Sequence, residues 1–370
     1  MKKNLVISAN SSWNIYNFRM HLIRKLSVNN RVIIVAPYDK YTKKILEEGY
    51  KFVNIKLSRN SLNIFSNLII FFNYLLIFIK YQPVAYLGFT IKPNIIGTFA
   101  SIFFKKINSY NFITGLGTFF FSKTFLHKFI LFFYKLVFIK SKIVFFQNNE
   151  DKTYFINQNI VKEKKSYLIN GSGIDLDFYN NKTYPKINKN FVFLCISRIN
   201  KDKGILEYID AAKMIKKEFS NVEFQLLGEI DNKYNNQIDK DYFNESIDNK
   251  IIKHINFVED VRNYIVKSDC IVLPSYREGS SRALLEGAAL SKPLIASDVP
   301  GCNNIIKNNF NGYLFKAKNS INTYEVMKKM LNLDIGQRKL MGKRSREYIK
   351  DKFEINLVNK SILEIIYMHI

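Results

Sequence analysis

Two glutamates eight residues apart, Glu278 and Glu286, lie in the stretch of the sequence best suited to hold a polar ligand. An apolar run precedes Glu278 and a helical pattern covers residues 281–291, so the predicted order is strand, turn, helix. Ser280 is a favourable N-cap residue, and the first N–H groups of the helix would favour an anion such as a diphosphate. Glu286 could accept two ribose hydroxyls and Glu278 those of a sugar. The alternative is a capped helix with an Arg282–Glu286 ion pair.

A second turn carries two cations, Arg198 and Lys203, between an apolar run and a helical pattern. Cations fixed after a buried strand can stabilise the negative charge that develops on a departing phosphate. Two solvated surface side chains are the alternative interpretation of this pair.

The charge of the 370-residue chain is uneven. Residues 1–183 hold 26 Lys+Arg and 8 Asp+Glu, a net charge of +18, whereas the remainder holds 30 and 23, a net charge of +7. This excess predicts a surface for a polyanion, either nucleic acid or an anionic membrane. We expect no nucleic-acid partner, because the aromatic residues lie in apolar runs and lysine dominates over arginine.

Cysteine and histidine usage predicts neither a disulfide framework nor a metal site. The three cysteines lie far apart in apolar surroundings and the four histidines have no ligand spacing, so we expect reduced thiols, no metal and no cofactor. Asp175 and Asp177 form a carboxylate pair, but their place in a turn favours capping. Residues 5–9 are too short an apolar run for a signal peptide, which favours a cytoplasmic protein.

Apolar runs alternate with helical patterns, which predicts an α/β protein with two doubly wound parallel sheets. The expected strands are 5–9, 32–37, 52–57, 85–89, 112–114, 143–147, 191–197, 222–227, 254–257, 270–274 and 293–298. A polar, turn-rich stretch around 170–190 indicates a linker between domains 1–183 and 184–350, and residues 351–370 form a helix expected to pack back on the first domain. Two such domains are expected to face a ligand-binding cleft.

Two apolar segments of the first half are candidates for membrane contact. Residues 60–79 contain no basic or acidic side chain, but six Asn or Ser residues interrupt the apolar sequence. An interfacial helix half in the core therefore fits better than a membrane span. In residues 125–139, Lys128 and Lys135 share a helical face among Phe and Leu residues, which is typical of an interfacial amphipathic helix. A core helix with a solvated lysine edge is the alternative there.

Taken together, the motifs of residues 190–315 resemble those of retaining GT-B-fold glycosyltransferases of the large Glu-x7-Glu family, family four. The resemblance rests on 197–204, 274–286, 292–301 and 311–312. It implies two Rossmann-like domains that face a cleft, with no protein nucleophile. The residues implied in catalysis are Arg198, Lys203 and Glu278, and those implied in donor binding are Gly279, Ser280, Ser281, Glu286, Gly228 and Glu229.

The first half resembles a narrower group of bacterial enzymes that extend lipid-linked glycans, through 16–19, 90–94, 113–117 and 170–178. This implies a UDP-sugar donor, an N-acetylhexosamine or hexose, and an acceptor saccharide on undecaprenyl diphosphate, in O-antigen, capsule or glycoprotein glycan assembly. It also implies a peripheral place on the anionic cytoplasmic face of the inner membrane. The residues implied in acceptor binding are Asn17, Arg19, Lys92, Gly115 and Gly117.

The sequence departs from the broader family at two places. Residues 10–14 replace the usual glycine-rich turn after the first strand, and no histidine stands near Lys92, where many relatives carry one. A GT-B phosphorylase or epimerase is the alternative activity, although no lysine-cofactor motif or isolated catalytic histidine supports either.

Overall fold

The computed structural model describes residues 2–57, 63–116, 125–180, 190–231 and 237–369. The chain divides into two compact units: unit 1 is Met1–Gly173 with Ile355–Ile370, and unit 2 is Ile174–Glu354. This division falls earlier in the chain than the boundary expected at residue 183, so the segment 174–180 belongs to unit 2.

Unit 1 contains a seven-stranded sheet in the order β3-β2-β1-β4-β5-β6-β7, with parallel pairing throughout. Its strands are β1 (Lys3–Ser8), β2 (Asn30–Ala36), β3 (Lys51–Asn54), β4 (Ala85–Phe89), β5 (Asn108–Ile113), β6 (Ile143–Phe146) and β7 (Ser166–Leu168). The central strands are buried on both faces, which explains their near-continuous apolar sequences.

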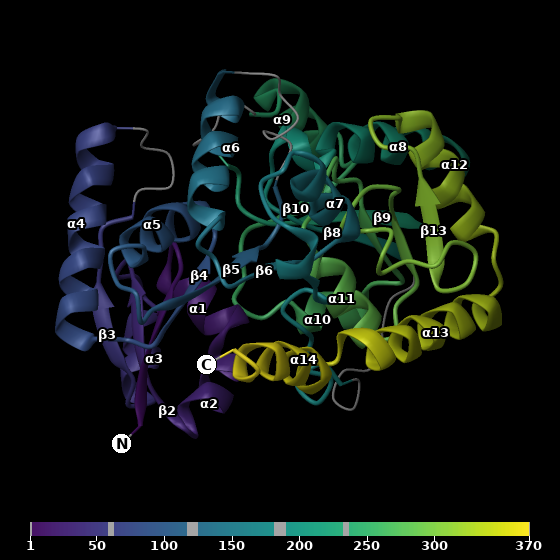
Figure 1. The fold of residues 1–370 in the computed structure, drawn as a ribbon. Helices are drawn as coiled ribbons and strands as arrows, with labels where there is room; N and C mark the ends of the chain where they lie inside the picture. Colours follow the sequence, from purple (N-terminus) through teal and green to yellow (C-terminus); the bar gives the residue numbers. More distant parts are fainter. Residues whose placement is uncertain (1, 58–62, 117–124, 181–189, 232–236, 370) are drawn as a thin grey trace. The chain divides into compact units, whose positions relative to one another are not determined.

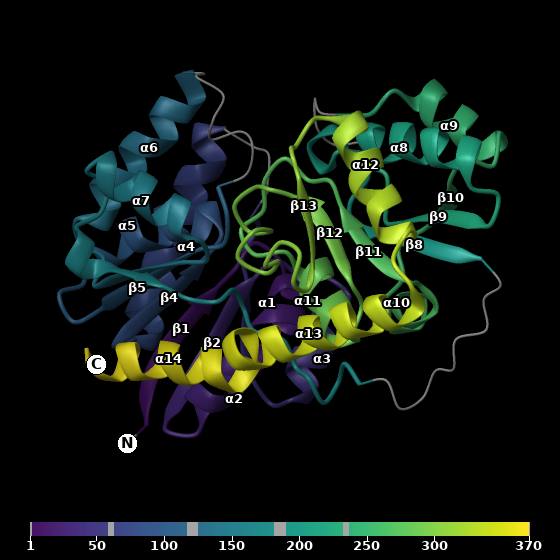
Figure 2. The ribbon, with the colours of Figure 1, turned by 90° about the vertical axis from the view of Figure 1, so that its right-hand side faces the viewer.

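Helices cover both faces of the unit 1 sheet (Figures 1 and 2). One face packs against α1 (Ser12–Phe18), α2 (Met20–Ser27), α3 (Thr42–Glu47) and α14 (Ile355–Tyr367). The other face packs against α4 (Ile64–Tyr81), α5 (Thr98–Ser101), α6 (Phe125–Phe138) and α7 (Asn149–Asn157). Two short helical segments, η1 (Pro93–Gly97) and η3 (Glu163–Lys165), complete the unit. The C-terminal helix α14 thus packs on unit 1, where Tyr110 donates a hydrogen bond to the Ile366 carbonyl at 3.4 Å.

Unit 2 repeats the architecture with a six-stranded parallel sheet in the order β10-β9-β8-β11-β12-β13. Its strands are β8 (Phe191–Ile196), β9 (Val222–Leu227), β10 (Lys253–Ile255), β11 (Cys270–Leu273), β12 (Leu294–Ser297) and β13 (Gly312–Phe315). Its helices are η4 (Lys201–Lys203), α8 (Ile205–Glu218), α9 (Lys240–Asp248), α10 (Arg262–Lys267), α11 (Arg282–Ala289), α12 (Ser320–Leu331) and α13 (Ile335–Phe353).

The prediction of two doubly wound parallel sheets is confirmed, but it missed two strands. These are β7 and β13, which form the outer edge of each sheet. They are three and four residues long.

Candidate functional site

Two loops of unit 2 carry most of the residues that the sequence assigns to the donor and to catalysis, and a third loop packs against them. The loops span 197–204 after β8, 274–281 after β11 and 298–301 after β12. These three strands are neighbours in the sheet. Because carboxyl ends of parallel strands lie at one edge, the three loops adjoin there, next to the point where the strand order reverses.

A close approach of two backbones brings the first two loops together. Gly204 follows η4 with a φ of +66°, and a Cβ there would lie 2.1 Å from the Pro274 carbonyl oxygen. Only glycine fits this position without a shift of the chain. The contact sets Lys203 beside Glu278, whose Nζ and Oε1 atoms are 2.5 Å apart, and each side chain is 16% exposed. Two residues predicted from separate motifs are therefore partners in one ion pair.

The third loop fixes the Glu278 turn from its other side. The Glu278 N–H donates to the Pro300 carbonyl and the Ser281 N–H to the Gly301 carbonyl, each at 3.0 Å. Gly301 has a φ of +80°, and a Cβ there would lie 2.5 Å from the Glu278 carbonyl oxygen. The turn is thus held by main-chain contacts to two neighbouring loops.

Ser281, not Ser280, caps helix α11, so that prediction was wrong. Ser281 has the extended backbone of an N-cap residue, and its Oγ accepts from the Leu284 N–H at 3.3 Å, whereas Ser280 remains in the preceding turn. The Ser281 N–H already donates to Gly301 within unit 2. Of the two serines, only Ser280 keeps its N–H without a partner among the described residues.

Several buried polar atoms on these loops, or next to them, lack a hydrogen-bond partner. Within the described part of the chain, such atoms include Asn200 Oδ1, Ser275 Oγ, Ser280 Oγ and Ser297 Oγ. Each uncompensated group costs about 1–3 kcal/mol. A polar ligand at this edge would remove that cost, which is what a binding site requires.

Arg198 forms a separate ion pair in the same edge region. Its Nη1 lies 3.0 Å from Asp231 Oδ2, and the arginine side chain is 54% exposed. Gly228 has a φ of +154°, and a Cβ there would lie 1.8 Å from the Ser197 carbonyl oxygen, so the loop after β9 packs tightly on the Arg198 loop. Glu229 is exposed, and its carbonyl accepts from the Ile199 N–H.

Glu286 has two partners, of which sequence reasoning found one. Its Oε1 lies 3.2 Å from Arg282 Nη2, the i,i+4 pair considered above. The same oxygen accepts a hydrogen bond from the Tyr179 hydroxyl at 2.9 Å. Tyr179 lies 107 positions away in a turn-rich segment, where no local pattern points to Glu286.

Two of the predicted acceptor-binding residues lie where α1 ends and α2 begins in unit 1. Asn17 is exposed on α1 and donates from Nδ2 to the Trp13 carbonyl at 2.9 Å. Arg19 is buried, and its guanidinium carbon lies 4.4 Å from the centre of the Phe89 ring. Arg19 therefore sits at the end of β4, whereas Asn17 points along its own helix.

The other predicted acceptor-binding residues follow β4 and β5. Lys92 donates to Asn67 Oδ1 at 3.0 Å, and partial burial lowers the pKa of its ammonium group. Gly115 has a φ of +112°, which other residues rarely adopt. Gly117 lies outside the described residues. The contacts given above do not join Asn17, Arg19 and Lys92 to one another.

Sequence reasoning noted the segments 10–14 and 90–94 but gave no role to three of their polar residues, which lie at the carboxyl edge of unit 1. Thr90 has a φ of +71°, a strained value for a β-branched residue, and its buried Oγ1 has no partner among the described residues. The buried Oδ1 atoms of Asn10 and Asn14 also have no hydrogen-bond partner among the described residues. Asn10 follows β1 and Thr90 follows β4, and these strands pair from Leu5 to Ser8, so the two residues leave the sheet side by side.

The carboxylates considered for metal binding have local partners. Asp175 Oδ1 accepts from the N–H groups of Asp177 and Phe178 at 3.0 and 2.9 Å, which is a capped turn. Within the described residues, no group of three or more His, Cys, Asp and Glu side chains is arranged to hold a metal ion.

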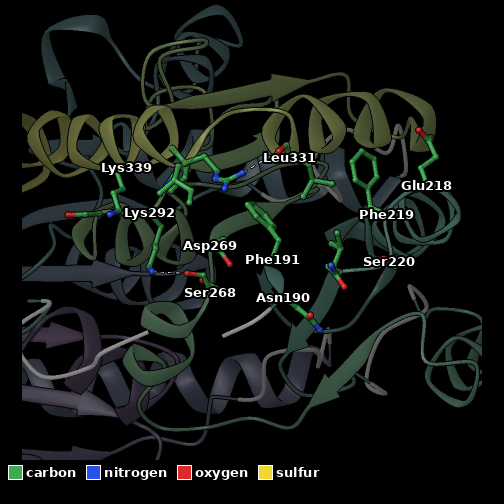
Figure 3. A pocket seen from close by; sticks show the side chains of 16 residues that line it. Asn190, Phe191, Glu218, Phe219, Ser220, Ser268, Asp269, Lys292, Leu331 and Lys339 are labelled. Carbon is green, nitrogen blue, oxygen red and sulfur yellow. Dashed lines mark hydrogen bonds between the residues drawn. The ribbon is translucent and has the colours of Figure 1, made fainter. Parts of the chain in front are cut away.

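A cavity of about 720 Å³ in unit 2 lies at the opposite, amino edge of the sheet (Figure 3). It is lined by residues that precede or begin strands, such as Phe191, Val222 and Asp269. Lys292 on its wall donates to the Ser268 carbonyl at 2.7 Å. Arg338 donates to the carbonyls of the helix end before it. These cations therefore hold main-chain carbonyls, and the cavity lies at the edge of the sheet opposite the three loops.

The fold and the loops define the class of protein. Residues 180–348 match the family described as Glycosyl transferases group 1, so the chain carries a glycosyltransferase domain of that family, and its fold is GT-B. Among solved structures, Anabaena HepE in complex with UDP and glucose aligns with a TM-score of 0.81 at 16% identity, over 99% of this chain and 100% of that one. That likeness supports the fold alone.

Two curated relatives indicate a narrower group. The N,N'-diacetylbacillosaminyl-diphospho-undecaprenol alpha-1,3-N-acetylgalactosaminyltransferase of Campylobacter jejuni is 29% identical over 83% of each chain. The UDP-Gal:alpha-D-GlcNAc-diphosphoundecaprenol alpha-1,3-galactosyltransferase of Escherichia coli is 31% identical over 48% of each chain.

Proposed function

We propose that this protein transfers a hexose or N-acetylhexosamine from a UDP-sugar to a saccharide on undecaprenyl diphosphate, with retention at the anomeric carbon, in bacterial surface-glycan or glycoprotein-glycan assembly. The observation that carries the donor half is the Lys203–Glu278 ion pair at the carboxyl edge of the unit 2 sheet, within the matched family region. The acceptor half rests on the two relatives whose names contain undecaprenol-linked sugars.

The proposed donor site divides its work among charged side chains. Glu286 accepts hydrogen bonds from the ribose hydroxyls, and Glu278 accepts them from hydroxyls of the transferred sugar. Arg198 and Lys203 face the diphosphate. The Ser280 N–H and hydroxyl add hydrogen bonds at the start of α11. Gly279 and Gly228 allow the backbone to approach the donor closely, and Glu229 lies beside the uracil base.

The reaction then needs no protein nucleophile. The bond between the anomeric carbon and the β-phosphate oxygen breaks, and its electron pair stays on UDP. The acceptor hydroxyl oxygen bonds to the anomeric carbon on the same face, and its proton passes to the departing phosphate oxygen. Cations placed at that oxygen stabilise the charge that develops there.

A UDP-release screen tests this function. The purified protein is mixed with a panel of UDP-sugars and with polyprenyl-diphosphate-linked N-acetylhexosamine acceptors. We expect UDP release that needs both the acceptor and one or two of the donors, and loss of donor affinity in the Glu286→Ala variant. Release that is independent of every acceptor, or no release with any pair, contradicts the proposal.

We further propose that unit 1 binds an anionic membrane through α4 and α6. Helix α4 buries Ile70, Tyr74 and Phe78 in the core. Its solvent face carries Phe65, Ile69, Phe72, Leu76 and Ile79, between 58% and 78% exposed. Of the helices described, α4 alone is long and apolar enough to span a membrane by length and composition. Because one side of α4 is buried in the core of unit 1, we propose that the helix lies in the membrane interface and does not span the membrane.

Helix α6 supports the same proposal. Phe129, Phe132, Leu136 and Ile139 are exposed along one face, and Lys128 and Lys135 are exposed beside them. An apolar stripe with basic neighbours suits an anionic lipid surface better than a neutral one, and residues 1–183 carry the excess charge of +18 derived above.

Vesicle flotation tests the membrane proposal. The wild type should float with vesicles that contain anionic lipid at low salt, and the Phe72→Ser/Leu76→Ser variant should bind at least about tenfold less, since each apolar side chain contributes roughly 1.5–3 kcal/mol when buried. Ile321→Ser/Ile335→Ser is the matched control, because these unit 2 residues are 65% and 63% exposed. Equal loss in both variants, or no flotation of the wild type, contradicts the proposal.

A further inference from the structure

The segment that opens unit 2 is attached to that unit by a partly buried arginine. Arg346 on α13 donates from Nη1 to the Tyr179 carbonyl at 2.7 Å and from Nη2 to the Leu176 carbonyl at 3.1 Å. It also donates to the carbonyl of Ala289 at the end of α11. One guanidinium therefore joins the segment to the helix that carries Glu286.

Two more residues of the same segment, both before Tyr179, are held by other parts of unit 2. Arg262 donates to the Phe178 carbonyl at 3.0 Å, and its guanidinium carbon lies 3.9 Å from the centre of the Phe178 ring. The Ile174 N–H donates to the Phe353 carbonyl at 2.8 Å. A turn-rich segment fixed at several points can place a side chain as accurately as a helix does.

The side chain placed in this way is the phenol of Tyr179. It is 7% exposed, and its hydroxyl donates to Glu286 Oε1, the same oxygen that Arg282 approaches. Burial, and then the charge of Glu286, raise the pKa of the phenol, so it stays protonated and remains a donor at physiological pH. Glu286 thus has one oxygen held by two donors from different elements.

We propose that Tyr179 is a positioning residue for nucleotide recognition, which holds the Glu286 carboxylate so that Oε2 faces the ribose hydroxyls of the donor. This inference rests on the proposed role of Glu286. Without the phenolic hydroxyl, the carboxylate keeps only the i,i+4 contact to Arg282, and such a pair on a helix surface constrains a side chain weakly. Binding of the ribose would then have to restrict the carboxylate itself.

Calorimetric titration with UDP and with 2′,3′-dideoxy-UDP tests the inference. In the Tyr179→Phe variant we expect UDP to bind about tenfold more weakly, because a hydrogen bond to a charged group is lost. The affinity for 2′,3′-dideoxy-UDP should change less than about twofold, since this ligand has no hydroxyl for Glu286. In turnover, KM for the UDP-sugar should rise by the same factor while kcat changes little.

A matched control separates positioning from general stability. Tyr242 is another tyrosine of unit 2 whose hydroxyl donates to a carboxylate, that of Asp210, on helices away from the three loops. The Tyr242→Phe variant should bind UDP as the wild type does. In the Glu286→Ala background, Tyr179→Phe should have no further effect on UDP affinity.

Each contrary result has a distinct meaning. If Glu286→Ala weakens UDP binding and Tyr179→Phe does not, the inference about Tyr179 is wrong while the proposed donor site stands. Equal weakening of UDP and 2′,3′-dideoxy-UDP by Tyr179→Phe also overturns it. If Glu286→Ala leaves UDP affinity unchanged, both the role of Glu286 and the inference built on it are overturned.

Discussion

The carboxyl edges of the two sheets differ in how their polar groups are arranged. In unit 2, the charged residues are paired before any ligand is present, as Lys203 with Glu278 and Arg198 with Asp231. In unit 1, the polar groups that stand out are the uncharged side chains of Asn10, Asn14 and Thr90, whose buried atoms have no partner among the described residues, as is also true of four such atoms at the unit 2 edge. Both edges belong to parallel doubly wound sheets.

This difference indicates how the same type of parallel sheet can bind two kinds of ligand. A nucleotide diphosphate has fixed charges, which preorganised ion pairs and helix N–H groups can meet at little cost. A saccharide offers neutral hydroxyls, which suit amide and hydroxyl groups that wait for a partner. We therefore propose that the edge with the paired charges binds the donor and that the strained edge of unit 1 binds the acceptor.

The largest expected effect concerns the charged edge. Lys203→Ala should lower kcat about 10²–10³-fold, the usual cost of removing one group that stabilises a developing oxyanion. Steady-state kinetics measures it, with Lys201→Ala as the control, because Lys201 is exposed on the same helical turn. Comparable losses in both variants would show that general surface charge, and not the ion pair with Glu278, is responsible.

The second effect concerns the packing that builds that edge. Gly204→Ala should destabilise the protein by about 1–3 kcal/mol more than Gly49→Ala, as measured by denaturant unfolding followed for each unit. Both glycines have a positive φ, but a Cβ at Gly204 meets the Pro274 carbonyl, whereas at Gly49 it meets nothing within 4 Å. Equal destabilisation would mean that the loops do not need this close contact.

The smallest effect concerns the strained edge of unit 1. Thr90→Gly should raise the free energy of unfolding by up to about 1 kcal/mol, since relief of the strain exceeds the entropy cost of glycine only slightly. It should also raise KM for the acceptor, because a hydroxyl is lost. Lys250→Gly, at another non-glycine with positive φ, is the control and should leave that KM unchanged. An unchanged acceptor KM in Thr90→Gly would remove Thr90 from the acceptor site.

The sequence predicted most of the donor edge because its residues lie in short motifs. Glu278 and Glu286 share one turn and helix, and Lys203 follows a recognisable strand, so type and spacing were informative. Spacing does not reveal which charges meet across loops, so the Lys203–Glu278 pair appears only in the structure. The same holds for Tyr179, whose partner is 107 positions away.

The acceptor edge was less predictable because its signals are conformational. The positive φ of Thr90 leaves no trace in a residue type that normally avoids it. Conformation also limited the prediction in unit 2, where the capping role of Ser281 depends on where the turn ends. The amphipathic character of α4 was partly visible, yet its apolar sequence could not separate Ile70, which is buried, from Ile69, which is 63% exposed.

The linkage formed in the product tests the central claim most directly. A UDP-α-sugar identified in the release screen is incubated with a polyprenyl-diphosphate-linked acceptor, and the proton spectrum of the purified disaccharide reports the new anomeric centre. We predict a single product in which the transferred sugar, if gluco- or galacto-configured, shows the small H1–H2 coupling of an α-linkage. A β-linked product, or hydrolysis of the donor without a new glycosidic bond, would contradict retaining transfer by this protein.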